Sequence, residues 1–292
     1  MRGDPAAHEL VAPGTLDGVL ALLAQEPGQW TPIAGGTELM VAYAAGRLAS
    51  KKLLSLWGIG ELRFISVAAD AIAIGAGSTF LDVRADPTVS TEFPLLAQAA
   101  SWIGSIANQS RATLGGNLVN GSPAADSSPA LLVYDAEVEF VSLRGRRRVP
   151  YSEFHIGYKR NLLAPDELLY ALHLPRRFAQ HRQYIRKVGT RRAMAISKTA
   201  LAGCALVEQG VVREIRLAAA SVAAFPTRLY RAEDAVLAKV LDPGTIPAAR
   251  AAALAEIAPI DDIRSTAEYR RIVTANLLQE FLSALAGNGE EQ

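Results

Sequence analysis

The sequence predicts an α+β protein of two domains. Its 292 residues are 50% hydrophobic and 20% charged, which is long and apolar enough to bury a substantial core in roughly two domains. Segments with helical spacing and segments that alternate like strands follow one another along the chain. Near residues 176–181 the pattern changes to longer strands followed by three helices. We therefore expect a first domain over residues 1–178, with subdomains of about 1–58 and 59–178, and a second domain over 179–292.

The first subdomain is predicted to contain a strand–helix–strand unit whose first crossing is glycine-rich. Apolar residues at helical spacing precede this unit, and Thr15 is expected to cap their helix. The expected elements, in order, are a helix at Leu16–Ala24, a strand at Trp30–Ala34 that runs into Gly35 and Gly36, a helix at Thr37–Gly46 and a strand at Lys52–Leu56.

The second subdomain mixes short strands with short helices. Strands are expected at Phe64–Val67, Ala71–Gly75, Glu137–Leu143 and Glu167–Leu174, and helices at Thr79–Arg84, Pro94–Ile103 and Pro129–Tyr134. Asn108–Gly121 is rich in glycine and asparagine and shows few helix or strand signals. The basic run Arg144–Arg148 is interpreted as a solvated hairpin turn, with a partner-docking patch as the alternative.

The second domain is predicted to be a small sheet followed by helices. Gln209-Gly210 is a favourable pair for a tight turn between two of its strands. Strands are expected at Gln183–Val188, Lys198–Glu208 and Val211–Ala220, and helices at Arg231–Val240, Pro247–Ile257 and Thr266–Leu285.

Composition excludes several classes of function. A formal net charge of +1 argues against an electrostatic nucleic-acid binder. The single cysteine, Cys204, cannot form a disulfide within the chain or ligate an iron–sulfur cluster or structural zinc, and the four histidines lack metal-ligand spacing. We expect no metal in this chain. No apolar stretch reaches about 18 residues and no signal peptide is evident, so we expect a cytoplasmic protein without a membrane span.

Two glycine-rich segments concentrate the candidate chemistry. PIAGGTELM covers Pro32–Met40, and TLGGNLVNGSPAAD covers Thr113–Asp126. Glycine permits a positive φ and lets the main chain approach a ligand closely, and successive N–H groups can form an anion nest. Neither segment contains Lys or Arg, so a bound diphosphate is expected to be held by backbone amides and hydroxyls. A turn and a helix cap remain the alternative for either segment alone.

Polar residues in the second segment suit the sugar part of a dinucleotide. Asp126 would repel phosphate and is better placed to accept hydrogen bonds from sugar or ribityl hydroxyls, while Asn117 and Asn120 can donate and accept. The stretch GAGSTF at Gly75–Phe80 lacks the third glycine of a dinucleotide fingerprint, and no P-loop motif occurs. A Rossmann or P-loop domain is therefore disfavoured.

These residues resemble a known family. AGGTEL at Ala34–Leu39 and TLGGNLVNGSPAADSSPALL at Thr113–Leu132 are similar to the paired FAD-binding segments of the molybdenum hydroxylase flavoproteins. That family includes the xanthine dehydrogenase FAD domain and the medium subunit of carbon monoxide dehydrogenase. FHIGYKRNLLAPDELLYALHLP at Phe154–Pro175 and RKVGTRRAMAISK at Arg186–Lys198 are similar to its xanthine dehydrogenase branch. The likeness runs from about residue 5 to residue 285.

The resemblance implies a vanillyl-alcohol-oxidase-like (PCMH-type) FAD-binding domain of two subdomains and a C-terminal α+β domain, an antiparallel sheet with helices. It also implies cofactor contacts. Ile33, Ala34, Gly35, Gly36, Thr37, Glu38 and Leu39 would wrap the diphosphate from one side, and Thr113, Gly116 and Asn117 from the other, with Asn120 nearby. Asp126 would bind a ribityl hydroxyl, Ile103 and Gly104 would lie near the adenosine or flavin, Leu168 and Leu169 would pack on the isoalloxazine ring, and Lys187 would approach its polar edge. The alternative for Leu168 and Leu169 is that they are ordinary strand residues, and the alternative for Lys187 is that it is a surface lysine.

By the same resemblance, the chain is an electron-transfer subunit. A [2Fe-2S] small subunit and a molybdopterin large subunit would supply the cofactors this chain cannot hold, in a dimer of heterotrimers, and FAD would pass electrons to NAD or another acceptor. The extra cluster of the 4-hydroxybenzoyl-CoA reductase branch is excluded by the single cysteine. NAD itself is in doubt because Ala193 and Met194 stand where NAD-dependent relatives carry acidic residues. A stand-alone FAD-dependent oxidase or reductase and a non-enzymatic binding module are the alternatives.

Overall fold

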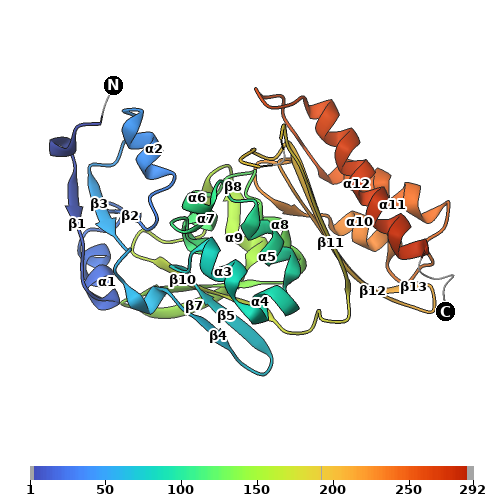
Figure 1. Cartoon of the computed structure of the whole chain (residues 1–292), viewed down its shortest axis with the longest axis horizontal. Helices are drawn as coiled ribbons and strands as arrows, with labels where there is room; N and C mark the ends of the chain where they lie inside the picture. The colour runs from blue at the N-terminus through green and yellow to red at the C-terminus, as the bar shows by residue number, and fades with distance from the viewer. Residues whose placement is uncertain (1–2, 192, 288–292) are drawn as a thin grey trace.

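The computed structural model describes residues 3–191 and 193–287. Three parts lie in a row: a small N-terminal part, a central part of helices and sheet, and a C-terminal sheet covered by helices (Figure 1). Each part has its own sheet, with three, five and four strands respectively, and a two-stranded hairpin accompanies the central sheet. The α+β fold class predicted from the sequence is confirmed.

The N-terminal part is a parallel sheet of order β1-β3-β2. Its elements are η1 (Pro5–Ala7), β1 (Glu9–Val11), α1 (Leu16–Gln25), β2 (Thr31–Ile33), α2 (Leu39–Ala44) and β3 (Lys52–Ser55). The Thr15 hydroxyl accepts a hydrogen bond from the Gly18 N–H at 3.2 Å, so the predicted N-cap is confirmed. The sequence did not indicate β1, because its three residues are largely exposed and leave no alternating pattern.

The central part is an antiparallel sheet of order β4-β5-β10-β6-β7 with most of its helices packed nearby (Figure 1). Its strands are β4 (Ile65–Val67), β5 (Ala71–Gly75), β6 (Glu137–Ser142), β7 (Gly145–Pro150) and β10 (Leu168–Pro175), and β8 (His155–Gly157) pairs with β9 (Arg160–Asn161). Its helices are η2 (Gly60–Leu62), α3 (Phe80–Ala85), α4 (Pro87–Glu92), α5 (Pro94–Ser101), α6 (Ile106–Gln109), α7 (Leu114–Asn120), α8 (Ser127–Val133) and α9 (Tyr151–Phe154).

The interpretation of Asn108–Gly121 as irregular was wrong, because most of this stretch is helical in α6 and α7. Ser105 caps α6 and Thr113 caps α7 through their hydroxyls. Glycines and asparagines are poor helix formers, but each helix is short and starts at a strong cap. Caps and tertiary contacts therefore outweigh propensity here.

The interpretation of Arg144–Arg148 as a hairpin turn was also wrong for most of its length. Gly145–Pro150 forms the edge strand β7, and only the Ser142–Gly145 connection makes the turn. Arg146 and Arg148 pair with Glu139 at 3.1 and 3.3 Å. The run is thus a strand whose charges are met by carboxylates on neighbouring strands.

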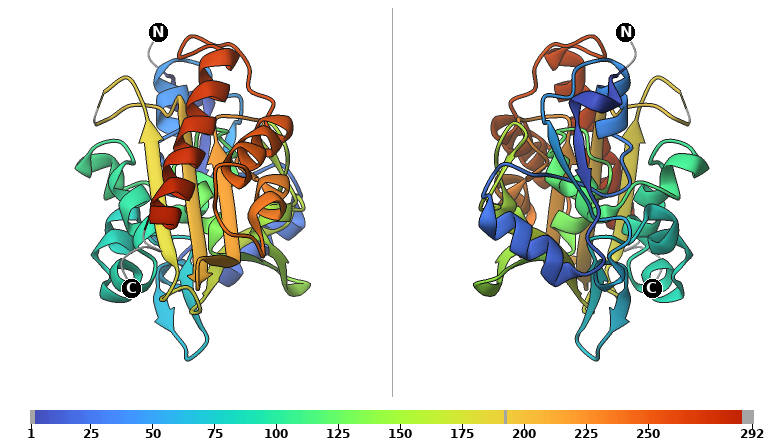
Figure 2. Two further views of the ribbon diagram at one scale, coloured as in Figure 1. Left: turned by 90° about the vertical axis from the view of Figure 1, so that its right-hand side faces the viewer. Right: turned by 90° about the vertical axis from the view of Figure 1, so that its left-hand side faces the viewer.

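The C-terminal part is an antiparallel sheet of order β11-β12-β13-β14 with three helices on one face, as Figure 2 shows most clearly in its left view. Its elements are β11 (Arg182–Val188), β12 (Thr199–Glu208), β13 (Val211–Ala220), β14 (Thr227–Arg228), α10 (Tyr230–Val236), α11 (Thr245–Glu256) and α12 (Ala267–Gly287). The predicted turn at Gln209-Gly210 is present, with φ of 52° and 77°. The three predicted strands and three predicted helices are confirmed.

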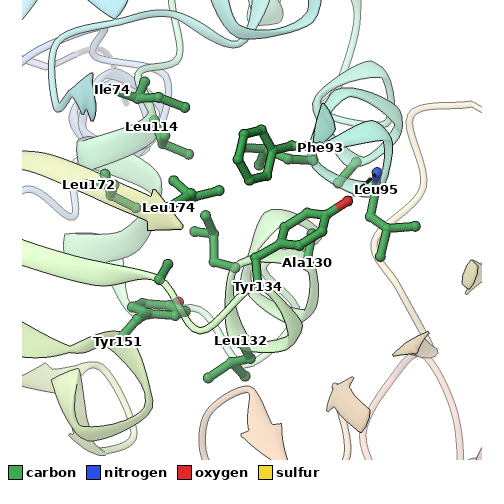
Figure 3. Close-up of a cluster of buried hydrophobic side chains, with 14 of the residues drawn as sticks. Ile74, Phe93, Leu95, Leu114, Ala130, Leu132, Tyr134, Tyr151, Leu172 and Leu174 are labelled. Carbon is green, nitrogen blue, oxygen red and sulfur yellow. Dashed lines mark hydrogen bonds between the residues drawn. The ribbon is translucent and has the colours of Figure 1, made fainter. Parts of the chain in front are cut away.

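The two faces of this C-terminal sheet belong to different cores. Alternate residues of β12 point to opposite faces: Leu201 and Ala205 join the core under the C-terminal helices, whereas Ala202 and Cys204 join the core of the central part. Tyr134 lies in the core of the central part, where its hydroxyl accepts a hydrogen bond from the Leu95 N–H at 3.1 Å (Figure 3). The central and C-terminal parts are therefore packed together through a continuous apolar core.

A buried histidine next to this core predicts acid sensitivity. His155 is 7% exposed, its Nδ1 finds no hydrogen-bond partner among the described residues, and burial lowers its pKa to about 4. Because the unfolded chain binds the proton near pH 6.5, native stability should fall by about 2–3 kcal/mol as the pH drops from about 6.5 to about 4. His155→Phe keeps an aromatic ring against Phe154 and Phe225. We expect the free energy of unfolding, measured with urea, to fall less in this variant than in the native protein between about pH 7 and about pH 4.5. An equal fall in both proteins would contradict the role of His155.

Candidate functional site

A cavity of about 600 Å³ lies between the N-terminal and central parts. Its walls come from the core helix α1, the loops after β2 and β3, the start of α7 and the segment 159–169. Among the described residues, none of the C-terminal part lines it. The cavity therefore lies where the N-terminal and central parts meet, next to an apolar cluster in which α1 packs with Val141 and Leu168 of the central sheet.

The first glycine segment forms one wall, and its two glycines serve different purposes. A Cβ on Gly35 would lie 1.7 Å from the carbonyl oxygen of Arg111, so this position admits only glycine for lack of space. Gly36 has φ +74°, a conformation that side chains rarely adopt. Gly35 thus brings the two segments together, and Gly36 turns the chain into α2.

The second glycine segment forms the facing wall as the first turn of α7. The Thr113 hydroxyl accepts a hydrogen bond from the Gly116 N–H at 3.1 Å. A Cβ on Gly115 would lie 2.5 Å from the Cβ of Ala76, whereas a Cβ on Gly116 would meet only the Thr113 hydroxyl, at 2.8 Å. Gly115 therefore allows close packing, and Gly116 leaves the cavity wall bare.

The structure brings most of the predicted site residues together. Those that line the cavity are Ala34, Gly35, Gly36, Thr37, Glu38, Leu39, Ile103, Thr113, Gly116, Asn117, Asn120, Leu168 and Leu169. Four predicted residues are not among its lining: Ile33, Gly104, Asp126 and Lys187. Ile33 and Gly104 each adjoin a lining residue in the chain, and Gly104 has φ +52°.

Asp126 and Lys187 form a buried ion pair with each other. The Lys187 ammonium donates to one carboxylate oxygen of Asp126 and the Ser197 hydroxyl to the other, each at 2.5 Å. Burial raises the pKa of Asp126, and the Lys187 ammonium and the Ser197 hydroxyl oppose the rise. Lys187 lies near the end of β11, and Ser197 lies at the end of the following loop, just before β12. One carboxylate of the central part therefore ties down both ends of a C-terminal loop.

Several lining residues escaped the sequence interpretation. Trp30 carries a buried indole N–H that finds no partner among the described residues, and Lys159 contributes a cation from the β8–β9 hairpin. Glu167 also lines the cavity, where the Arg147 guanidinium holds the pKa of its carboxyl below the usual range. A lone tryptophan or lysine gives no pattern in sequence, although Lys159 lies within the stretch Phe154–Pro175 that carries the family resemblance.

The residues present fit an extended dinucleotide. The volume is within the range of small-molecule and cofactor sites, about 300–1,000 Å³, and two glycine-bearing walls without Cβ atoms face each other across it. Leu168 and Leu169 provide an apolar surface suited to an aromatic ring, and Asn117 and Asn120 provide donors and acceptors.

Comparison with known proteins identifies the family. Residues 6–177 match the FAD-binding domain in molybdopterin dehydrogenase, and residues 184–285 match the carbon monoxide dehydrogenase flavoprotein C-terminal domain. The chain belongs to this flavoprotein family. It is an FAD-binding oxidoreductase subunit of the xanthine dehydrogenase and carbon monoxide dehydrogenase type. The resemblance inferred from the sequence is confirmed.

Two relatives and one solved structure match this flavoprotein subunit along nearly their whole length. The xanthine dehydrogenase FAD-binding subunit of Escherichia coli O157:H7 is 32% identical over 94% of this chain and 95% of its own. The carbon monoxide dehydrogenase medium chain of Hydrogenophaga pseudoflava is 29% identical over 96% and 97%. A solved carbon monoxide dehydrogenase from the same organism superposes with a TM-score of 0.91 at 29% identity, covering 97% of this chain and 98% of that one.

Two other properties of the flavoprotein subunit bear on the expectations from sequence. In residues 3–191 and 193–287, no helix is long and apolar enough to cross a membrane. Over the same ranges, no group of three or more His, Cys, Asp or Glu side chains is arranged to hold a metal ion. Cys204 is buried in the apolar core, as expected for a small hydrophobic residue.

Proposed function

We propose that this subunit passes electrons from [2Fe-2S] clusters of a partner subunit, through its FAD, to an external acceptor. One observation carries the proposal. Among the described residues that line the cavity, no histidine, tyrosine or cysteine occurs, and Glu167 is locked by Arg147 through two hydrogen bonds of 2.7 and 2.6 Å. A flavin oxidase acting on its own substrate would need a base or acid over the flavin. The other titratable residues that line the cavity, Glu38 and Lys159, pair with each other beside the first glycine segment, which is the wall proposed for the diphosphate.

The cofactor contacts proposed for the chain follow the two glycine walls. Residues 33–39, Thr113, Gly116 and Asn117 would hold the diphosphate, and Leu168 and Leu169 would pack on the flavin ring. When bound, FAD accepts electrons singly and releases them in pairs. The protein's part is to hold and orient it, exclude water from the apolar surface and expose one edge. Asp126 and Lys187 do not line the cavity, so their proposed contacts, with a ribityl hydroxyl and with the polar edge of the flavin, require the cofactor to reach the ion pair that they form.

The partners follow from what this chain lacks. Cys204 is the single cysteine of the sequence, and [2Fe-2S] clusters need several cysteine ligands. We therefore place the clusters in a small partner subunit. From the family resemblance we further propose that a large subunit holds the molybdopterin cofactor, that the complex is a cytoplasmic dimer of heterotrimers, and that NAD or another compound is the acceptor. The solved carbon monoxide dehydrogenase from Hydrogenophaga pseudoflava, in a form that lacks the Mo-pyranopterin moiety of its molybdenum cofactor, is an enzyme of that cofactor class and supports the second assignment. The domain boundary proposed at residues 178–179 is supported by family matches that end at 177 and resume at 184.

Anaerobic flavin reduction in the intact complex tests the proposal. The complex is isolated through a tag on this chain, and candidate N-heteroaromatic compounds, purines, aldehydes and carbon monoxide are added while the flavin absorbance is followed. We expect one of them to bleach the flavin, and inactivation of the molybdenum centre by cyanide to prevent the bleaching. Bleaching that survives cyanide, or that occurs in the chain freed of its partners, would show direct oxidation of substrate by this subunit and refute the proposal.

A further inference from the structure

Lys159 is the one cationic side chain among the described residues that line the cavity. Its ammonium lies 3.5 Å from a carboxylate oxygen of Glu38, which belongs to the first glycine segment. The Lys159 side chain is 44% exposed and that of Glu38 is 61% exposed. An ion pair of this length and exposure contributes little to stability. Either side chain can therefore leave it to form a stronger contact.

The backbone of Lys159 is held in place from the other side of the cavity. Lys159 has φ +51°, and its Cα lies 3.0 Å from where a Cβ on Gly121 would stand, at the end of α7. The Asn161 side-chain amide donates to the Val119 carbonyl at 3.2 Å, which fastens the same hairpin to α7. The hairpin is thus pinned to the second glycine segment while the lysine side chain reaches the first.

Among the described residues that line the cavity, Lys159 is the cation available to an anionic ligand. The other lining acid, Glu167, already has the Arg147 guanidinium and the Ala164 N–H as partners. A diphosphate bound between the glycine walls would be repelled by Glu38 and attracted by the ammonium beside it. We infer that the Lys159 ammonium breaks its ion pair with Glu38 and binds the diphosphate of FAD. This deepens the proposed function, on which it rests, and replaces the expectation that no basic side chain helps to hold the diphosphate.

FAD rebinding to the deflavinated complex tests the inference. FAD is titrated by flavin fluorescence at low and high salt into the native complex and into complexes with Lys159→Gln, Lys159→Arg or Arg160→Gln. Arg160 is the matched control, because it is the next residue of the same hairpin, is exposed and does not line the cavity. Loss of a charge-assisted contact at a half-exposed lysine should weaken FAD binding by roughly 10-fold at low salt.

The expected pattern is specific to charge. Lys159→Gln should weaken FAD binding and reduce its salt dependence, since screening acts on the contact that was removed. Lys159→Arg should bind FAD nearly as tightly as the native protein, and Arg160→Gln should bind FAD as tightly as the native protein. Unchanged affinity in Lys159→Gln, or an arginine variant as weak as the glutamine variant, would overturn the inference. A native complex that takes up no FAD would instead refute the proposed function.

Discussion

A Gly116→Val variant is expected to fold and to purify without FAD. Gly116 lines the cavity from the first turn of α7, and an added Cβ would meet only the Thr113 hydroxyl, at 2.8 Å. That hydroxyl can rotate away at the loss of one helix cap, about 1 kcal/mol, so the fold should survive. The isopropyl group would then occupy the bare wall where the main chain approaches the cofactor. The ratio of flavin to protein absorbance, measured beside thermal unfolding, reports both effects.

Other glycine variants give the controls. Gly60→Val adds the same side chain where nothing lies within 4 Å, outside the cavity, and should keep its flavin. Gly116→Ala should retain an intermediate amount. Gly36→Val should also lose FAD, but φ +74° at Gly36 would strain the backbone as well, so Gly116 separates binding from folding better. A Gly116→Val protein with a full complement of flavin would remove this residue from the proposed site.

Asp126→Ala is expected to lower both stability and FAD affinity. Removal of the carboxylate leaves the Lys187 ammonium, 11% exposed, without its buried partner. Breaking one side of a buried ion pair costs about 3–5 kcal/mol. The proposed hydrogen bond to a ribityl hydroxyl would add a loss of about 1.5–3 kcal/mol in FAD binding. Urea unfolding of the flavin-free protein measures the first quantity, and fluorescence titration with FAD the second.

A second variant separates these two losses. Asp126→Ala combined with Lys187→Met removes both charges and should recover much of the stability lost in the single variant, because no unpaired charge remains buried. If FAD affinity recovers with it, neither Asp126 nor Lys187 contacts FAD, and the proposed ribityl and flavin-edge contacts are both ruled out. Ser197→Ala should cost only about 1 kcal/mol, the contribution of one hydrogen bond. An Asp126→Ala variant that is as stable as the native protein in urea unfolding would contradict the ion pair itself.

Local sequence signals predicted the elements but not all of their contacts. The strand–helix–strand unit around Gly36, the turn at Gln209-Gly210 and the long C-terminal strands were visible because each depends on its own residues. Helix α7 was missed because its formation depends on the Thr113 cap and on Gly115 packing against Ala76, and the second contact involves a residue distant in sequence. Strand β7 was missed because its arginines pair with Glu139 on β6 and Glu167 just before β10, which are distant in sequence.

The same limit applies to the site. The two glycine segments could be named from sequence because close approach of backbone requires glycine, and their facing arrangement shows directly in the cavity. The pairing of Asp126 with Lys187 joins residues 61 positions apart, and the nearness of Lys159 to Glu38 spans 121. Neither spacing carries a periodic signal, so both had to come from the fold.

The position of the cavity also links vitamin supply to protein abundance. A ligand that binds only the native state adds RT ln(1 + [L]/Kd) to the free energy of unfolding, and here it would contact both the N-terminal and the central part. Cells short of riboflavin would then hold more of this polypeptide in partly opened forms, which proteases degrade. Depletion of the subunit, and not only its inactivity, is the expected outcome of flavin starvation.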